Sequence, residues 1–319
     1  MNPTQLFRFY GKIFFLLMLL AQPSTNLKAQ SDSIKRPSVG NHYFTPITQS
    51  NMPSTNTYLS TLTGFGQTLD LVHQLELIDG APLIGLQGEV TFIDVGFAYQ
   101  QRVRDWLAAY ISLNVSARIG TELQSILTQG VSTIGGFEIG WHIKLLETEK
   151  IALSTNIELQ NLEGNFVNVL GFVNDIIDGH PNPSLNKTVP VLAFSTGLRF
   201  AWGLNDLIGI KASANMAYGE TYNRGENGFS LSTGAGIDFD FYPRYSLPVG
   251  LVIHYNISSM PEIVYVDDKY AQILQTKLAY TKASDFNLGI EFSYMKVPFI
   301  NQEKSPSVYS VALAARYYF

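Results

Sequence analysis

Apolar and polar residues alternate with a period of two along most of the chain. The clearest run is 307–319, where apolar or aromatic residues occupy every second position: Tyr309, Val311, Leu313, Ala315, Tyr317 and Phe319. The positions between them are mostly small, polar or charged. Because side chains along a strand point alternately to its two faces, this run predicts a strand with one apolar and one polar face.

Similar runs recur through the chain, with turn residues between them. The run at 69–77 also fits a helix, and the run at 274–280 is weaker than the others. Together the runs predict about twelve strands, within a range of about 10 to 14. They lie at 69–77, 93–99, 107–119, 137–145, 151–159, 192–202, 208–218, 229–241, 247–257, 274–280, 286–294 and 307–319.

The segments between these runs are alternately short and long. Transmembrane β-barrels have short turns at one end and long loops at the other, whereas a soluble sandwich has no reason for this regularity. The chain is therefore predicted to be all-β, a transmembrane antiparallel up-and-down β-barrel over residues 66–319. The short segments are 103–106, 147–150, 203–206, 242–245 and 282–285, and the long ones are 120–136, 162–189, 220–227, 258–270 and 297–306.

The composition agrees with a membrane barrel. Charged residues make up 15% of the 319-residue chain, against about 25% in an ordinary globular domain. Trp106, Trp141 and Trp202 fall near ends of the runs, where amphipathic rings favour membrane interfaces. No stretch of about 18 continuous apolar residues predicts a transmembrane helix. The net charge of −5 gives no sign of a nucleic-acid partner.

The N-terminal residues have the features of an export signal. Arg8 and Lys12 precede a short apolar run at 13–21, and small residues are placed for cleavage near Ala29–Gln30. This predicts a signal peptide at 1–29, with an N-terminal anchor helix as the alternative. Residues 30–65 are polar and rich in turn residues, and they are interpreted as a leader or as a plug segment that enters the pore.

If the apolar set faces lipid, nearly all of the strand charges face the interior. Acids and bases are almost balanced there, which leaves two interpretations: a salt-bridge network that fills the barrel, or a polar permeation path. The residues predicted to line the lumen are Arg118, Glu138, His142, Lys144, Glu158, Arg199, Lys211, Asp238, Asp240, His254, Glu291 and Arg316.

One long loop contains apolar residues at helical spacing, before Asp178–Gly179. The spacing predicts a short amphipathic helix. Such a helix could pack on the barrel rim, touch the outer leaflet, or form a gate for hydrophobic substrates. The residues assigned to this gate loop are Phe166, Leu170, Phe172 and Ile176.

The sequence contains no recognisable catalytic or cofactor motif. The five His residues lack metal-ligand spacing, and there is no Cys. His142 and His254 both fall on the inward set, so a shared site is conceivable. The chain is predicted not to be an enzyme and to need no cofactor or metal. A lipid-directed enzyme on the barrel rim is the least favoured alternative.

Over residues 65–319 the chain resembles bacterial outer-membrane β-barrels of the porin and transporter kind. The resemblance rests on the signal peptide, the alternating strands, the loop asymmetry and the ending Arg316–Tyr317–Tyr318–Phe319. It implies a Gram-negative outer-membrane location, contact with outer-membrane lipid, and assembly by the barrel-assembly machinery, which recognises Tyr317 and Phe319. The Ala29–Gln30 junction and the absence of Cys resemble Bacteroidetes-type envelope proteins.

Two functions follow as hypotheses. The first is a passive channel or transporter for small solutes, hydrophobic ones included. The second is a non-transporting structural barrel, or one that binds a ligand or partner.

Overall fold

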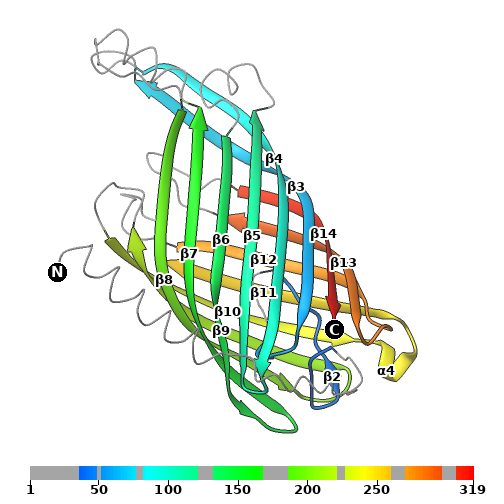
Figure 1. Cartoon of the computed structure of the whole chain (residues 1–319). Coiled ribbons are helices and arrows are strands. Elements are labelled where there is room, and N and C mark those ends of the chain that lie inside the picture. Colours follow the sequence, from blue (N-terminus) through cyan, green and yellow to red (C-terminus); the bar gives the residue numbers. More distant parts are fainter. Residues whose placement is uncertain are drawn as a thin grey trace, which may run out of the picture.

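The described part of the chain forms a closed, all-antiparallel β-barrel. The computed structural model describes residues 36–48, 52–76, 82–120, 132–167, 186–220, 227–259, 270–296 and 307–319. Twelve strands in these ranges close into one barrel (Figure 1), so the predicted fold class and strand number are confirmed. They are β3 Tyr58–Glu76, β4 Pro82–Arg104, β5 Leu107–Gly120, β6 Ser132–Glu147, β7 Ile151–Val167, β8 Asn186–Gly203, β9 Ile208–Glu220, β10 Asn227–Asp240, β11 Val249–Ser259, β12 Tyr270–Tyr280, β13 Phe286–Lys296 and β14 Ser307–Tyr318.

The barrel closes between its first and last strands. β14 pairs with β3 from Ser307 opposite Leu69 to Tyr318 opposite Tyr58. Residues 69–76 of the predicted run therefore belong to a strand and not to a helix. β3 begins at Tyr58, before the predicted barrel boundary at residue 66.

Two further boundaries differ from the sequence interpretation. β7 continues to Val167 and β8 begins at Asn186, so parts of the predicted loop at 162–189 are strand. Phe166 lies in β7, opposite Lys187 of β8, and not in a helical loop. Residues 1–35, which include the predicted signal peptide, lie outside the described residues, as do residues 168–185 of the gate loop.

The short turns and the C-terminus lie at one end of the barrel, at the lower right in Figure 1, which we call the short-turn end. The turn between β10 and β11 contains α4, Tyr242–Tyr245. The main chain at the C-terminus is fixed there, because Tyr318 N donates to Asp285 O (2.7 Å) and Phe319 N donates to Thr57 O (3.2 Å). None of the described helices has the length and apolar character to span a membrane.

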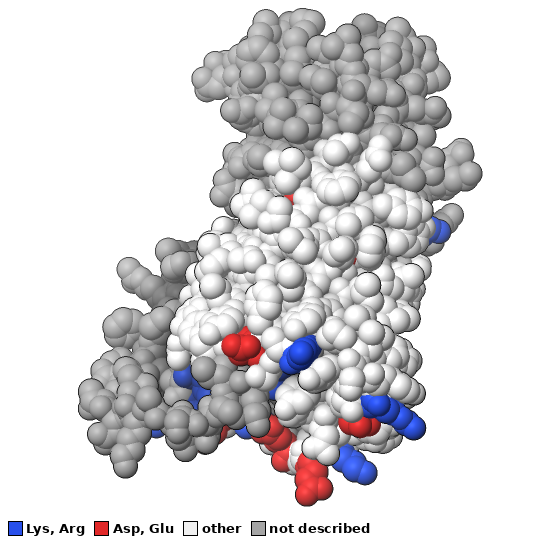
Figure 2. Space-filling view, turned by 90° about the vertical axis from the view of Figure 1, so that its right-hand side faces the viewer, with Lys and Arg blue, Asp and Glu red and all other residues white. Residues whose placement is uncertain are grey.

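Apolar side chains cover the outside of the barrel. Ile253 in β11 and Phe292 in β13 are 42% and 48% exposed, whereas His254, the next residue after Ile253, is fully buried. On the face drawn in Figure 2, Lys, Arg, Asp and Glu gather toward the short-turn end, and the wall above is almost free of them. An apolar band with charges at its border is the surface that a lipid bilayer requires.

The first described residues form a plug inside the short-turn end. We define the plug as residues 36–48 and 52–57. It begins with a two-residue hairpin, β1 Ser38–Val39 and β2 His42–Tyr43. Gly40 and Asn41 join the strands with φ of 63° and 62°, as a type I′ turn requires at both central positions.

The plug also supplies apolar side chains to the barrel interior. Val39, Phe44 and Met52 form one buried cluster with Ala152 of β7 and Ala201 of β8. These contacts remove apolar surface of the plug from water, which favours its position inside the wall.

Candidate functional site

Four buried charged side chains from four strands face the plug. They are Lys211 of β9, Asp238 of β10, Lys277 of β12 and Glu291 of β13, all at most 4% exposed. Each occupies an inward position of a strand whose alternate positions face outward. A buried charge is costly unless it has ionic or hydrogen-bonding partners, so these residues need partners inside the barrel.

The main chain of the plug supplies most of those partners. Lys211 Nζ donates to Thr45 O (2.9 Å), and Lys277 Nζ donates to Pro46 O (2.8 Å). In the opposite direction, Thr45 N donates to Asp238 Oδ2 (2.7 Å), and Thr48 N donates to Glu291 at 3.2 and 3.3 Å from its two oxygens. The segment 45–48 is thus held by two cations at its carbonyls and two anions at its amides.

The same four side chains are also arranged in pairs along the wall. Lys211 Nζ lies 3.8 Å from Asp238 Oδ2. Lys277 is the register partner of Glu291 across β12 and β13. The four groups carry two positive and two negative charges, so the site is electrically balanced by itself.

His42 fixes the hairpin of the plug against β10. Its Nε2 lies 3.1 Å from Asp238 Oδ1, and its Nδ1 lies 3.2 Å from Asp206 O. The ring therefore lies between an oxygen of β10 and a carbonyl of the β8–β9 turn, and it ties the hairpin to both. The ring also meets Phe44 edge-on at 4.6 Å between centroids.

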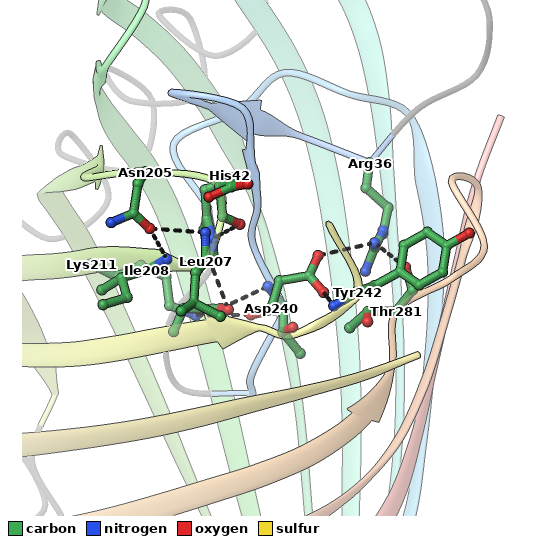
Figure 3. A network of polar contacts seen from close by, with 12 residues as sticks. Arg36, His42, Asn205, Leu207, Ile208, Lys211, Asp240, Tyr242 and Thr281 are labelled. Carbon is green, nitrogen blue, oxygen red and sulfur yellow. Dashed lines mark hydrogen bonds and ion pairs between the residues drawn. The ribbon is translucent and has the colours of Figure 1, made fainter. Parts of the chain in front are cut away.

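The start of the plug is held at the β12–β13 turn. Arg36 N donates to Ser284 O (2.6 Å), and its guanidinium donates to Thr281 O (2.5 Å) and lies 3.9 Å from Asp240 (Figure 3). Asp240 in turn accepts a hydrogen bond from Tyr242 N at 3.1 Å, at the start of α4.

The end of the plug is held on β4, which is separated from β13 by β14 and β3 around the wall. Gln100 Nε2 donates to Ser54 O (3.0 Å) and to Asn56 O (2.8 Å). Thr55 Oγ1 donates to Asp105 O (2.9 Å) in the β4–β5 turn. The Arg102 guanidinium hydrogen-bonds the Asp105 carboxylate and lowers the pKa of that exposed group. The two ends of the plug are therefore attached to different parts of the wall, at the β12–β13 turn and at β4.

A second polar cluster centres on Glu158 of β7. Its carboxylate accepts hydrogen bonds from Tyr110, Ser195, Asn156 (2.9 Å) and Gln160 (2.6 Å). Arg199 of β8 lies 3.9 Å from Glu158, and its Nη1 lies 3.1 Å from His142 Nδ1. Since a guanidinium can only donate, His142 Nδ1 is the acceptor, and Nε2 carries the hydrogen.

Several buried neutral groups of the interior have no hydrogen-bond partner among the described residues. Register links them into neighbouring rows: His142 opposes Asn156, and Asn156 and Asn215 both oppose Gly197. Unmade hydrogen bonds of buried groups are uncommon in native proteins. These atoms are His142 Nε2, Ser154 Oγ, Asn156 Oδ1, Ser213 Oγ, Asn215 Oδ1 and both ring nitrogens of His254.

The remaining residues predicted to line the lumen differ in burial and in their partners. Arg316 is buried, with its guanidinium 4.1 Å from the centre of the Tyr58 ring. Glu138 is half-buried, and Lys144 pairs with Glu147 at the end of β6. The side chain of Arg118 in β5 lies outside the described set.

The other predicted sites are outside the interior or outside the described residues. Tyr317 and Phe319 stack on the outer surface at 5.8 Å, and Phe319 also stacks on Tyr99 at 6.3 Å. The side chain of Phe166, and Leu170, Phe172 and Ile176 altogether, lie outside the described residues. Within the described ranges, no group of three His, Cys, Asp or Glu is placed to hold a metal.

Sequence reasoning missed the binding of the plug by its main chain. Main-chain amides and carbonyls are present at every residue, so 45–48 carries no sequence signal for this role. The adjacent Gly40–Asn41 pair between extended residues was the signal that could have predicted the hairpin.

Comparisons with known proteins define the fold. No protein-family model matches the sequence, and no curated protein matches it. An outer-membrane channel from Pseudomonas putida F1 is similar in structure, with a TM-score of 0.53, 11% identity, and coverage of 86% of this chain and 99% of that chain.

Two further solved structures are similar at lower scores. The NanC porin has a TM-score of 0.49 and 9% identity, over 81% of this chain and 98% of that chain. The translocator domain of autotransporter NalP from Neisseria meningitidis has a TM-score of 0.49 and 8% identity, over 84% and 90%. Together with the closed barrel, the first similarity shows that the chain has the fold of bacterial outer-membrane β-barrels.

Proposed function

We propose that this bacterial outer-membrane-type β-barrel is a passive channel for small solutes and that its plug holds the channel closed. The observation that carries the proposal is that a separate segment, the plug, lies inside the short-turn end and is bonded to the wall. Hydrogen bonds such as Thr45 N to Asp238 fasten that segment to the wall. A segment held in this way can leave without breaking the pairing between the wall strands.

The distribution of side chains supports a conduit across a membrane. The outer wall is apolar at residues such as Ile253 and Phe292, while inward positions carry Glu158, Arg199 and Lys211. Polar and charged linings are how channels admit hydrated solutes. An outer-membrane location, insertion by the barrel-assembly machinery and contact with outer-membrane lipid are parts of the same proposal.

The described interior favours hydrophilic solutes over hydrophobic ones. Its inward residues include the Glu158 network and the neutral groups of His142, Asn156 and His254. The apolar residues that suggested hydrophobic substrates, Leu170, Phe172 and Ile176, lie outside the described residues. We therefore propose small hydrophilic solutes as the first class to test.

Conductance of a variant with a weakened plug tests this function. A Cβ at Gly40 would lie 2.5 Å from Gly203 O, and the positive φ of Gly40 is unfavourable for alanine. Gly40→Ala should release the plug more often than the wild type does. Gly135→Ala is the matched control, since a Cβ there meets nothing within 4 Å.

In planar bilayers we expect Gly40→Ala to conduct more often than the wild type and Gly135→Ala. Chymotrypsin cleavage after Phe44, which is fully buried in the closed state, reports plug release in the same sample. A barrel that is folded, has a cleavable plug and still passes no current would contradict the channel. That outcome would favour the second candidate, a non-transporting barrel. The hydrogen-bonded side chains around Glu158 support this candidate, because they occupy space inside the barrel.

A further inference from the structure

The wall recognises the central plug segment through its main chain. With residues 45–48, Lys211 and Lys277 donate to main-chain carbonyls, and Asp238 and Glu291 accept from main-chain amides. None of these hydrogen bonds involves a side chain of residues 45–48. Main-chain recognition fits many sequences, provided that the peptide is extended and has free amides where the anions are.

The wall also has room for an aromatic side chain next to this segment. A Cβ built on Gly209 of β9 would lie 2.5 Å from Phe44 Cε1, so the absence of a side chain at Gly209 leaves the space that the Phe44 ring fills. The site therefore combines an aromatic position with charged groups that bind the following main chain.

The site does not depend on the plug for its charge balance. Lys211 and Asp238 are 3.8 Å apart, and Lys277 opposes Glu291 in register. If the plug leaves, Lys211 keeps Asp238 and Lys277 still opposes Glu291, so none of these four charges is left without an opposite charge nearby. A site that is stable when empty can exchange one occupant for another.

We propose that the inner wall at the short-turn end is a receptor site for an extended polypeptide segment supplied by another chain. The plug occupies this site in cis, and a partner segment with an aromatic residue followed by free backbone amides and carbonyls replaces it. The site lies at the short-turn end, so the partner enters from that side. The inference concerns the occupant of the site and does not require that the barrel conducts.

A labelled peptide and the full-length protein test the proposal. The probe is a fluorescein-labelled peptide of residues 36–48, added to detergent-solubilised protein, with binding read by fluorescence anisotropy. Gly40→Ala protein, whose own plug is weakened, should bind the peptide at least about tenfold more tightly than the wild type or Gly135→Ala, because a weaker cis occupant competes less.

Changes in the peptide separate main-chain from side-chain recognition. N-methylation at Thr45 or at Thr48 removes the amide that donates to Asp238 or Glu291. Each should weaken binding about tenfold, as expected for a lost hydrogen bond to a charged group. Thr45→Ala and Thr48→Ala peptides keep both amides and should bind within about threefold of the parent.

A variant of the wall completes the test. Lys277→Met combined with Glu291→Gln removes one cation and one anion together, so the fold is not left with an unpaired buried charge. Introduced into Gly40→Ala protein, the pair should weaken peptide binding. Heat-modifiable migration on a gel confirms that each barrel is folded.

Two results would overturn the proposal: folded Gly40→Ala protein that binds no peptide, or N-methylated peptides that bind as tightly as the parent. Anisotropy reports binding and not current. Failure here therefore leaves the conductance of the plug-weakened variant as an independent measurement of the proposed function.

Discussion

Lys211 and Asp238 lie 3.8 Å apart on β9 and β10, and both bind Thr45 of the plug, one at its carbonyl and the other at its amide. The pair therefore links two wall strands and the plug in one contact. Removing one partner affects the ion pair and the plug together, whereas removing both leaves no charge behind.

We expect Asp238→Ala to destabilise the barrel by about 3–5 kcal/mol, because Lys211 stays buried without its anion. The double variant with Lys211→Met should recover a large part of that loss, since no unpaired charge remains. Urea unfolding, followed by heat-modifiable gel migration, measures the loss of stability in Asp238→Ala, in Lys211→Met and in the double variant. These three values complete a double-mutant cycle. A double variant as unstable as the sum of the single variants would show that the pair is not coupled.

The approach of the hairpin to β8 predicts the effect of a side chain at Gly203. A Cβ at Gly203 would overlap Val39 O, so Gly203→Ala should displace β1 and β2 from the wall. The expected result is faster chymotrypsin cleavage after the buried Phe44 than in wild type, with Gly135→Ala unchanged. Equal cleavage rates for the three proteins would mean that the hairpin does not need this close approach.

Because the outer wall is apolar, the free-energy cost of placing a charge on it should depend on how deep the position lies in the bilayer. Ile253 lies in the interior of β11, and Leu247 lies in the turn before it; they are 42% and 51% exposed. Ile253→Arg should cost about 2–4 kcal/mol in a bilayer, and Leu247→Arg about 0–1 kcal/mol. Folding titrations in phospholipid vesicles measure both. Similar costs for the two variants would contradict a lipid-facing wall with its border near α4.

The C-terminal aromatic residues predict an assembly defect. Phe319 stacks on Tyr317 and Tyr99 at the short-turn end, and the resemblance to outer-membrane barrels assigns it to the recognition signal. Deleting Phe319 should lower the amount of folded protein in the outer-membrane fraction, while Phe319→Tyr keeps the ring and should assemble normally. Normal assembly of the truncated chain would remove Phe319 from the signal.

In the Glu158 cluster, we expect the negative charge of Glu158, more than the shape of its side chain, to contribute to stability. Glu158→Gln keeps the size of the side chain but leaves Arg199 without its carboxylate partner. The variant should lose about 1.5–3 kcal/mol, the range for hydrogen bonds to charged groups. The same unfolding measurement checks this, with Gln160→Glu as a comparison that adds charge at the neighbouring inward position on β7.

The sequence pattern predicted the orientation of some residues correctly and the secondary structure of others wrongly. Leu313 and Ile253 were predicted to face outward because their neighbours along the strand are polar or small, and both are exposed. Phe166 was assigned to a helical loop because its apolar neighbours fall at helical spacing, yet it pairs with Lys187 as part of β7. Pairing with a neighbouring strand overrides a local helical period, because the ladder supplies hydrogen bonds along the whole segment.

By itself the sequence determined the all-β class, the number of strands and the outward face, because side-chain alternation is a local property that each strand carries in its own residues. Only the tertiary structure decided which main-chain groups of the plug bind the inner wall at the short-turn end. The contacts of Thr45 and Pro46 with Lys211 and Lys277 join residues more than 160 positions apart. The acceptors are main-chain carbonyl oxygens, which every residue has, so no sequence pattern could predict these contacts.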